Sequence, residues 1–200
     1  MPLIHKLAKK TVYKFVDENI ISEDDYEIYE YGAQIFFATI LSFLGVIGIG
    51  VAAKEVLWSI LFLLSYCSIR YYTGGYHADS FRKCICSFWI IFLSGLFINS
   101  TFHLFLSLSS FVLVLTISNI FTFLFAPVEA LNNKLPVERK RLMKKRAFLI
   151  INFWLILLFI LQLNQSDLRG SIYWALISID FLLLLGNIKN RKELKRHENE

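Results

Sequence analysis

The sequence contains only three cysteines in 200 residues, and this small, odd number disfavours a disulfide framework. It also has no HExxH motif and no set of His and Cys residues at metal-ligand spacing, so we expect neither a metal site nor a cofactor. No Asp-rich motif is present, which disfavours a lipid-headgroup transferase. The net charge is +5, but no basic stripe is interleaved with aromatic side chains, so we expect no nucleic-acid partner.

We expect no cleavable signal peptide, because the first apolar run begins only after about thirty polar or amphipathic residues. No polar stretch is long enough to fold as a soluble domain of its own. We therefore expect a single integral membrane domain over residues 1–200. Its expected parts are an interfacial segment at 1–32, a transmembrane bundle at 33–186 and a charged tail at 187–200.

Long apolar runs fill most of the chain. Hydrophobic residues make up 56% of the sequence and the mean hydropathy is +0.54, whereas soluble domains contain about 45–50% apolar residues. Runs of this length and purity predict transmembrane helices, so the expected fold is all-α and polytopic. Six spans are expected, at 33–53, 56–69, 84–99, 102–125, 147–163 and 171–186.

The distribution of Lys and Arg predicts the orientation of these spans. If both termini are cytoplasmic, 19 of the 21 Lys and Arg residues fall in the inner segments, and only Lys54 and Arg169 lie outside. We therefore expect a protein of the cell membrane whose polar stretch at 70–83 faces the cytoplasm.

Apolar residues at helical spacing over residues 3–16 predict an N-terminal amphipathic helix whose other faces carry four lysines. Two placements are open for this helix: in the headgroup layer of the membrane lipid, or packed on the protein's own cytoplasmic face. In the first span, Gly45, Gly48 and Gly50 are expected to allow close approach of other helices.

The stretch from Arg70 to Cys84 is the one part of the sequence whose residue types are not explained by helix packing in a membrane bundle. A neutral His and a thiol can together form a nucleophile near neutral pH, because the imidazole removes the thiol proton. On a straight helix His77 and Cys84 would lie on nearly the same face but about 10 Å apart along the axis. The chain must therefore bend, with His77 in a loop and Cys84 in the first turn of the next helix, where the helix dipole favours the thiolate.

The other two cysteines are weaker candidates for the nucleophile. Cys86 is rotated by about 200° from Cys84 on a helix, and Cys67 falls inside an apolar span as an ordinary buried thiol. A His/Cys pair alone is not specific, so a solvated loop with an incidental His77 is an equal alternative on these residues.

Two motifs resemble the accessory gene regulator B (AgrB) family of Gram-positive bacteria. The first is Arg70-x4-Gly75-Tyr76-His77-Ala78-x5-Cys84 after an apolar span, and the second is Ala126-Pro127-Val128-Glu129 followed by Asn133-Lys134, Pro136 and basic residues. Here Leu135 separates Lys134 from Pro136, which the family is expected to place side by side. Size, span content and motif order match across nearly the whole chain.

The resemblance implies a membrane cysteine endopeptidase that processes an AgrD-like quorum-sensing propeptide. His77 is then the general base, and Cys84 is the nucleophile that releases the C-terminal tail of the propeptide and holds the rest as a thioester. A Cys or Ser side chain of the substrate closes a thiolactone or lactone ring. The family resemblance also implies a homodimer.

Further residues are expected to support this site. Arg70 orients the site or binds a substrate carboxylate, unless it is only a positive-inside anchor. Gly75 and Lys134 belong to the two motifs that resemble the family. Arg139, Lys140 and Arg141 could hold the acidic tail of the propeptide, and fixing the membrane topology explains them equally well.

Two other function classes are open: a peptide transporter or exporter, and a non-catalytic membrane scaffold. The transporter is disfavoured because spans one to five have no charged residue well inside them, and Asp180 in the sixth stands alone. In a scaffold, Cys84 could be replaced by Ser or Ala without loss of function.

Overall fold

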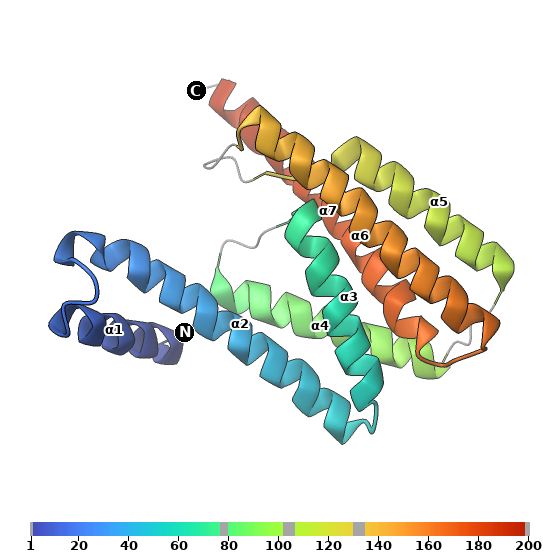
Figure 1. The fold of residues 1–200 in the computed structure, drawn as a ribbon, viewed down its shortest axis with the longest axis horizontal. Coiled ribbons are helices and arrows are strands. Elements are labelled where there is room, and N and C mark those ends of the chain that lie inside the picture. Colours follow the sequence, from blue (N-terminus) through green and yellow to red (C-terminus); the bar gives the residue numbers. More distant parts are fainter. Residues whose placement is uncertain (1, 77–79, 102–106, 130–134, 199–200) are drawn as a thin grey trace. The chain divides into compact units, whose positions relative to one another are not determined.

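The structure is a computed structural model that describes residues 2–76, 80–101, 107–129 and 135–198. These residues form helices joined by short connections, with no strand in the described part of the chain, so the all-α fold is confirmed (Figure 1). The elements are α1 (Pro2–Asp17), η1 (Glu23–Asp25), α2 (Tyr26–Ala52), α3 (Val56–Thr73), α4 (Phe81–Thr101), α5 (Leu108–Phe125), α6 (Val137–Leu163) and α7 (Arg169–Glu198).

Among the described residues, five helices are long and apolar enough to cross a membrane: α2 together with η1, α4, α5, α6 and α7. Large apolar side chains such as Leu44, Leu113 and Leu149 are exposed along them, as expected for surfaces that face lipid. The expected span at 56–69 corresponds to α3, which is not among the five. The chain is thus an α-helical membrane protein, while the count of six spans and the cytoplasmic termini stay predictions.

The chain divides into two compact units. Unit 1 comprises residues 1–49 and 78–92, and unit 2 comprises residues 50–77 and 93–200. Each unit is described by itself below.

In unit 1 the amphipathic helix α1 packs on α2 (Figure 1). Ile4 of α1, Ala38 of α2 and Ile85 of α4 form one buried apolar cluster. The four lysines of α1 are exposed, as the amphipathic pattern predicts. The helix thus packs on α2, and its placement in the headgroup layer or on the cytoplasmic face stays a prediction.

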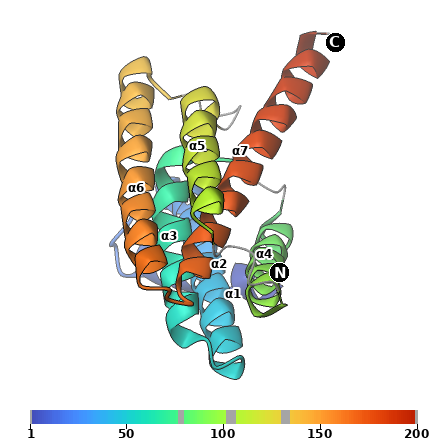
Figure 2. The same cartoon turned by 90° about the vertical axis from the view of Figure 1, so that its right-hand side faces the viewer.

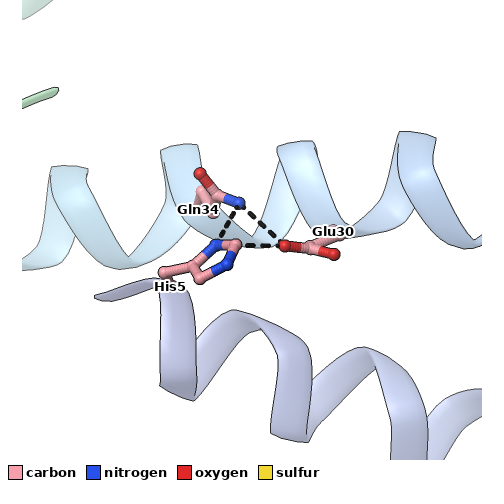
Figure 3. A network of polar contacts seen from close by, with 3 residues as sticks. All are labelled: His5, Glu30 and Gln34. Atoms are coloured by element: carbon pink, nitrogen blue, oxygen red, sulfur yellow. Dashed lines mark hydrogen bonds and ion pairs between the residues drawn. The ribbon is translucent and has the colours of Figure 1, made fainter. Parts of the chain in front are cut away.

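Polar side chains join the same two helices beside this cluster. The Gln34 side-chain amide lies 3.1 Å from the Nδ1 atom of His5 and donates to Glu30 over 3.1 Å, and the His5 ring lies 3.1 Å from the same carboxylate oxygen (Figure 3). The network links α1 to the first turns of α2 through residues on one side of each helix. It fixes the register in which α1 packs.

The glycines of α2 differ in what they allow. Gly45 lies under the Trp89 ring of α4, whose indole N–H donates to the Ser42 carbonyl over 3.2 Å. Gly50 lies against Ser59 of α3 in unit 2. The prediction of close approach is confirmed at these two glycines and is wrong for Gly48, where an added Cβ would meet no side chain or other helix within 4 Å in the described part of the chain.

Unit 2 is built around α7, which contacts α3, α5 and α6 (Figures 1 and 2). In its most apolar stretch 61% of the residues are buried, against 17–28% in the other four candidate spans, so α7 is the central helix of the unit. Hydrogen bonds cross between helices inside the apolar bundle, where unsatisfied polar groups are costly. They run from Ser118 to Asp180 at 2.7 Å, from Trp154 to Ser68 at 2.8 Å and from Asn152 to Asn119 at 3.2 Å.

The helix ends of unit 2 bring two connecting segments together. The C-terminal ends of α3 and α5, the beginning of α6 and the later part of α7 lie at the same end of the bundle (Figure 1). The segments 74–76 and 126–129 lie there and contact each other. Most of the motif residues in the described part of unit 2 are therefore gathered at one end.

Candidate functional site

Cys84 lies in the first turn of α4, as the sequence predicts. The helix begins at Phe81, and the backbone N–H of Cys84 donates to the carbonyl oxygen of Ser80 over 3.0 Å. The Ser80 hydroxyl lies 3.4 Å from the N–H of Lys83 and accepts from it, so Ser80 caps this helix end. The free thiol of Cys84 belongs to an exposed residue. This arrangement leaves the sulfur open to a substrate and beside the positive end of the helix dipole.

Another face of α4, about 100° around the helix from Cys84, anchors the start of this helix in unit 1. Phe81, Ile85 and Trp89 recur at helical spacing and pack on the apolar cluster of unit 1. Cys86 is also exposed, but it leaves the helix in a direction about 200° away from Cys84. The two thiols therefore do not share one surface.

His77 and Lys134 lie outside the described residues, so their expected roles stay predictions. The helix before His77 ends at Thr73 and the helix after it begins at Phe81. A single straight helix through His77 to Cys84 is therefore excluded, as a His/Cys pair at hydrogen-bond reach requires. The pairing of the two side chains itself stays a prediction.

The segment before His77 is held by Arg70 from the last turn of α3. Its guanidinium donates to the carbonyl oxygen of Gly74 over 3.4 Å and to the carbonyl oxygen of Tyr76. Gly75 is buried and has φ +130°, a backbone conformation that side chains rarely adopt. A Cβ added there would lie 2.6 Å from the Arg70 Nη1 atom. Gly75 thus lets the guanidinium reach the backbone of its own loop.

The second motif packs directly on the first. The N–H of Val128 donates to the carbonyl oxygen of Thr73 over 2.9 Å, and Val128 forms a parallel bridge with Gly74. Gly74 has φ +65°, and a Cβ there would collide with the Val128 carbonyl oxygen. The two motifs, which are far apart in the sequence, form one structure in unit 2.

Helix α7 also contacts the loop before His77, in addition to Arg70 and Val128. These contacts were not predicted from the sequence. The carbonyl oxygen of Leu182 accepts a hydrogen bond from the N–H of Tyr76 over 2.9 Å, and Gly186 lies against the same loop. The ammonium group of Lys189 lies 5.3 Å from the centre of the Tyr76 ring. A leucine, a glycine and a lysine near the end of an apolar run are ordinary in composition, so no signal in the sequence marks these contacts.

The basic residues at the start of α6 are partly engaged by the chain itself. The Lys140 ammonium lies 3.0 Å from the Glu129 carboxylate, and the Glu129 side chain is only 17% exposed. The Asn190 side chain of α7 donates to the Glu129 carbonyl oxygen over 2.8 Å. Arg139 and Arg141 are exposed and stay available to a charged partner.

Unit 1 offers an accessible thiol at a helix N-terminus, and unit 2 holds in place the backbone one residue before a histidine. These are the parts that nucleophilic catalysis by a Cys/His pair requires. Among the described residues, no group of three or more His, Cys, Asp or Glu side chains could hold a metal ion.

Comparison with known proteins gives one consistent result. The family model of accessory gene regulator B, AgrB, matches residues 8–185. An AgrB-like protein of Clostridium perfringens strain SM101 is 29% identical over 187 residues, which cover 86% of this chain and 85% of the relative. AgrB-like protein 2 of Clostridium perfringens strain 13 is 29% identical over 74% of each chain, and an AgrB-like protein of Clostridium beijerinckii is 24% identical over 94% of each. No solved structure matches the chain.

Proposed function

The chain belongs to the accessory gene regulator B family, and we propose that it is a membrane cysteine endopeptidase of quorum sensing that processes an AgrD-like propeptide. The observation that carries this proposal is the family match over residues 8–185, which includes both His77 and Cys84. Two structural features support it: the exposed thiol in the first turn of α4, and the hydrogen bonds by which Arg70 holds the backbone just before His77.

In the proposed reaction, His77 removes the proton of the Cys84 thiol, and the thiolate attacks a backbone carbonyl carbon of the propeptide. The C–N bond breaks, the imidazolium returns its proton to the leaving amine, and the C-terminal tail departs. The remaining peptide stays on Cys84 as a thioester.

Ring closure regenerates the enzyme. A Cys or Ser side chain of the bound peptide attacks the thioester carbonyl, its proton passes to the Cys84 sulfur, and a thiolactone or lactone leaves. Exchange of one thioester for another is close to thermoneutral, so closure competes with hydrolysis only where water is excluded. The tether also makes the step intramolecular, which raises the effective concentration of the attacking group.

The basic residues differ in their contacts, and we therefore assign them different roles. The Arg70 guanidinium is directed at its own loop, which favours orientation of the site over binding of a substrate carboxylate. Arg139 and Arg141 are exposed at the start of α6, and we assign them the attraction of the acidic tail. The Lys140 ammonium is paired with the Glu129 carboxylate, so it attracts the acidic tail of the propeptide less strongly.

No observation favours the exporter alternative. An ionisable residue inside a membrane bundle is the usual mark of a transport path. Asp180 is 6% exposed and accepts a hydrogen bond from Ser118 over 2.7 Å, so it has a partner within the interface of α5 and α7. This contact is sufficient to explain why the bundle tolerates the carboxyl group.

Intact-mass analysis tests the proposed mechanism. The protein is co-expressed in membranes with an AgrD-like propeptide, as wild type, Cys84→Ala and Cys86→Ala. We expect a hydroxylamine-labile adduct of the peptide minus its tail on the wild type and on Cys86→Ala only. Processing that continues unchanged in Cys84→Ala would show that the thiol is not the nucleophile and would end the proposal.

A further inference from the structure

The later part of α7 contacts both motif segments of unit 2, and the proposed reaction assigns it no role. Leu182 accepts the hydrogen bond of the Tyr76 N–H at 2.9 Å. Two turns further along, Lys189 lies 5.3 Å from the Tyr76 ring, and Asn190 donates to the Glu129 carbonyl oxygen over 2.8 Å. One side of the helix thus follows the loop that leads into His77.

Gly186 lies in the middle of these contacts and is buried. A Cβ added to it would lie 2.7 Å from the backbone nitrogen of Tyr76 and 2.9 Å from the carbonyl carbon of Gly75. Both atoms belong to the backbone, so no side-chain rotation can relieve the overlap. A side chain at this position must move either α7 or the loop.

The loop is restrained on its other sides, so it cannot shift freely. Arg70 holds the carbonyl oxygens of Gly74 and Tyr76, and Val128 holds Thr73. A displacement away from α7 stretches the Tyr76 to Leu182 hydrogen bond and carries the backbone at the position next to His77 with it. A side chain at position 186 is therefore expected to displace the backbone directly before His77.

We propose that Gly186 is a positioning residue of the reaction: its missing side chain lets α7 hold the backbone at Gly75 and Tyr76, directly before the proposed general base. This inference rests on the proposed function. A misplacement of a catalytic group by about 1 Å costs roughly a hundredfold in rate. We expect a loss of that size when Gly186 is replaced by alanine.

Two other helical glycines provide matched controls. Gly95 of α4 lies at least as tightly against its neighbours, and the three atoms nearest to a Cβ added there belong to the Trp174 side chain. A Cβ at Gly95 therefore disturbs the packing of unit 2 without pushing on the backbone before His77. Gly48 has open space around it and reports the effect of a helical Gly→Ala change alone.

The test compares Gly186→Ala, Gly95→Ala, Gly48→Ala and His77→Ala in a Cys86→Ala background of the full-length protein in membranes. Three quantities are measured: the thermal unfolding temperature, the rate of adduct formation with the AgrD-like propeptide, and the pH dependence of Cys84 alkylation by iodoacetamide. We expect Gly186→Ala to form adduct about a hundredfold more slowly. We expect its alkylation profile to match that of His77→Ala, while Gly95→Ala and Gly48→Ala keep the starting profile.

The outcomes separate this inference from the proposed function. A wild-type adduct rate and alkylation profile in Gly186→Ala would overturn the positioning role, and so would an equal change in both quantities in Gly95→Ala. Processing that persists in Cys84→Ala or His77→Ala would instead overturn the proposed function.

A second variant serves if Gly186→Ala does not fold. Lys189→Met keeps an unbranched apolar stem and removes the positive charge, which lies over the Tyr76 ring and 3.8 Å from the Glu193 carboxylate. We expect a two- to fivefold slower adduct rate, the size of an exposed cation–π contact, at an unchanged unfolding temperature. An unchanged rate in Lys189→Met would count against the role of α7.

Discussion

The two parts of the candidate site are held by different kinds of contact. Cys84 is placed by its own helix: α4 begins at Phe81, and the nearest backbone partner of Cys84 is Ser80. The loop before His77 is placed by Arg70 of the helix that precedes it, and by two distant parts of the sequence, the segment at 126–129 and α7. The position of Cys84 therefore follows from the local sequence, whereas the loop before His77 takes its position only after the bundle of unit 2 has formed.

The largest expected effect comes from the residue that clamps the loop. Arg70→Lys keeps the positive charge, but a compact ammonium cannot reproduce the planar fork that reaches the carbonyl oxygens of both Gly74 and Tyr76. We expect the rate of adduct formation to fall about a hundredfold, because the loop loses its defined position. The rate is measured by intact mass at saturating propeptide.

Arg191→Lys serves as the matched control, since Arg191 is exposed on the last part of α7. It should keep the starting rate. If Arg70→Lys also keeps the starting rate, Arg70 acts only as a charge that fixes the membrane topology, and the contrast between the two parts of the site loses its main support.

This contrast also explains which features could be predicted from the sequence. The all-α fold and the position of Cys84 at the start of a helix follow from apolar runs and helix boundaries, and the structure confirms them. The partner of Asp180 and the approach of Gly186 to the loop depend on which helices become neighbours. Periodicity reports which face of a helix is apolar and does not report which helix covers that face.

A smaller effect is expected at the ion pair between the second motif and α6. The Glu129 and Lys140 side chains lie 3.0 Å apart, and the lysine is half exposed, so solvent weakens the attraction. Lys140→Glu should slow processing by about two- to fivefold through repulsion of Glu129. The double variant Glu129→Lys with Lys140→Glu should recover most of that rate.

The double variant separates two roles of Lys140. If Lys140 mainly holds the acidic tail of the propeptide, a glutamate at position 140 repels the tail whether or not position 129 carries a lysine. The rate then stays low in the double variant. Recovery instead shows that the ion pair acts within the protein, by fixing the segment at 126–129 beside the loop.

The smallest effect is expected for Cys86→Ala, on the helix that carries Cys84. Cys86 is exposed on the same helix as Cys84, but it points about 200° away, so a histidine placed to activate one thiol does not reach the other. Cys86→Ala should therefore process the propeptide within twofold of the wild-type rate, and Cys84→Ala should form no adduct although Cys86 is present. Peptide mapping of the adduct in both variants measures this. An adduct on Cys86 in the Cys84→Ala variant would show that α4 can rotate or shift its register, and that the position of the nucleophile depends on more than its own helix.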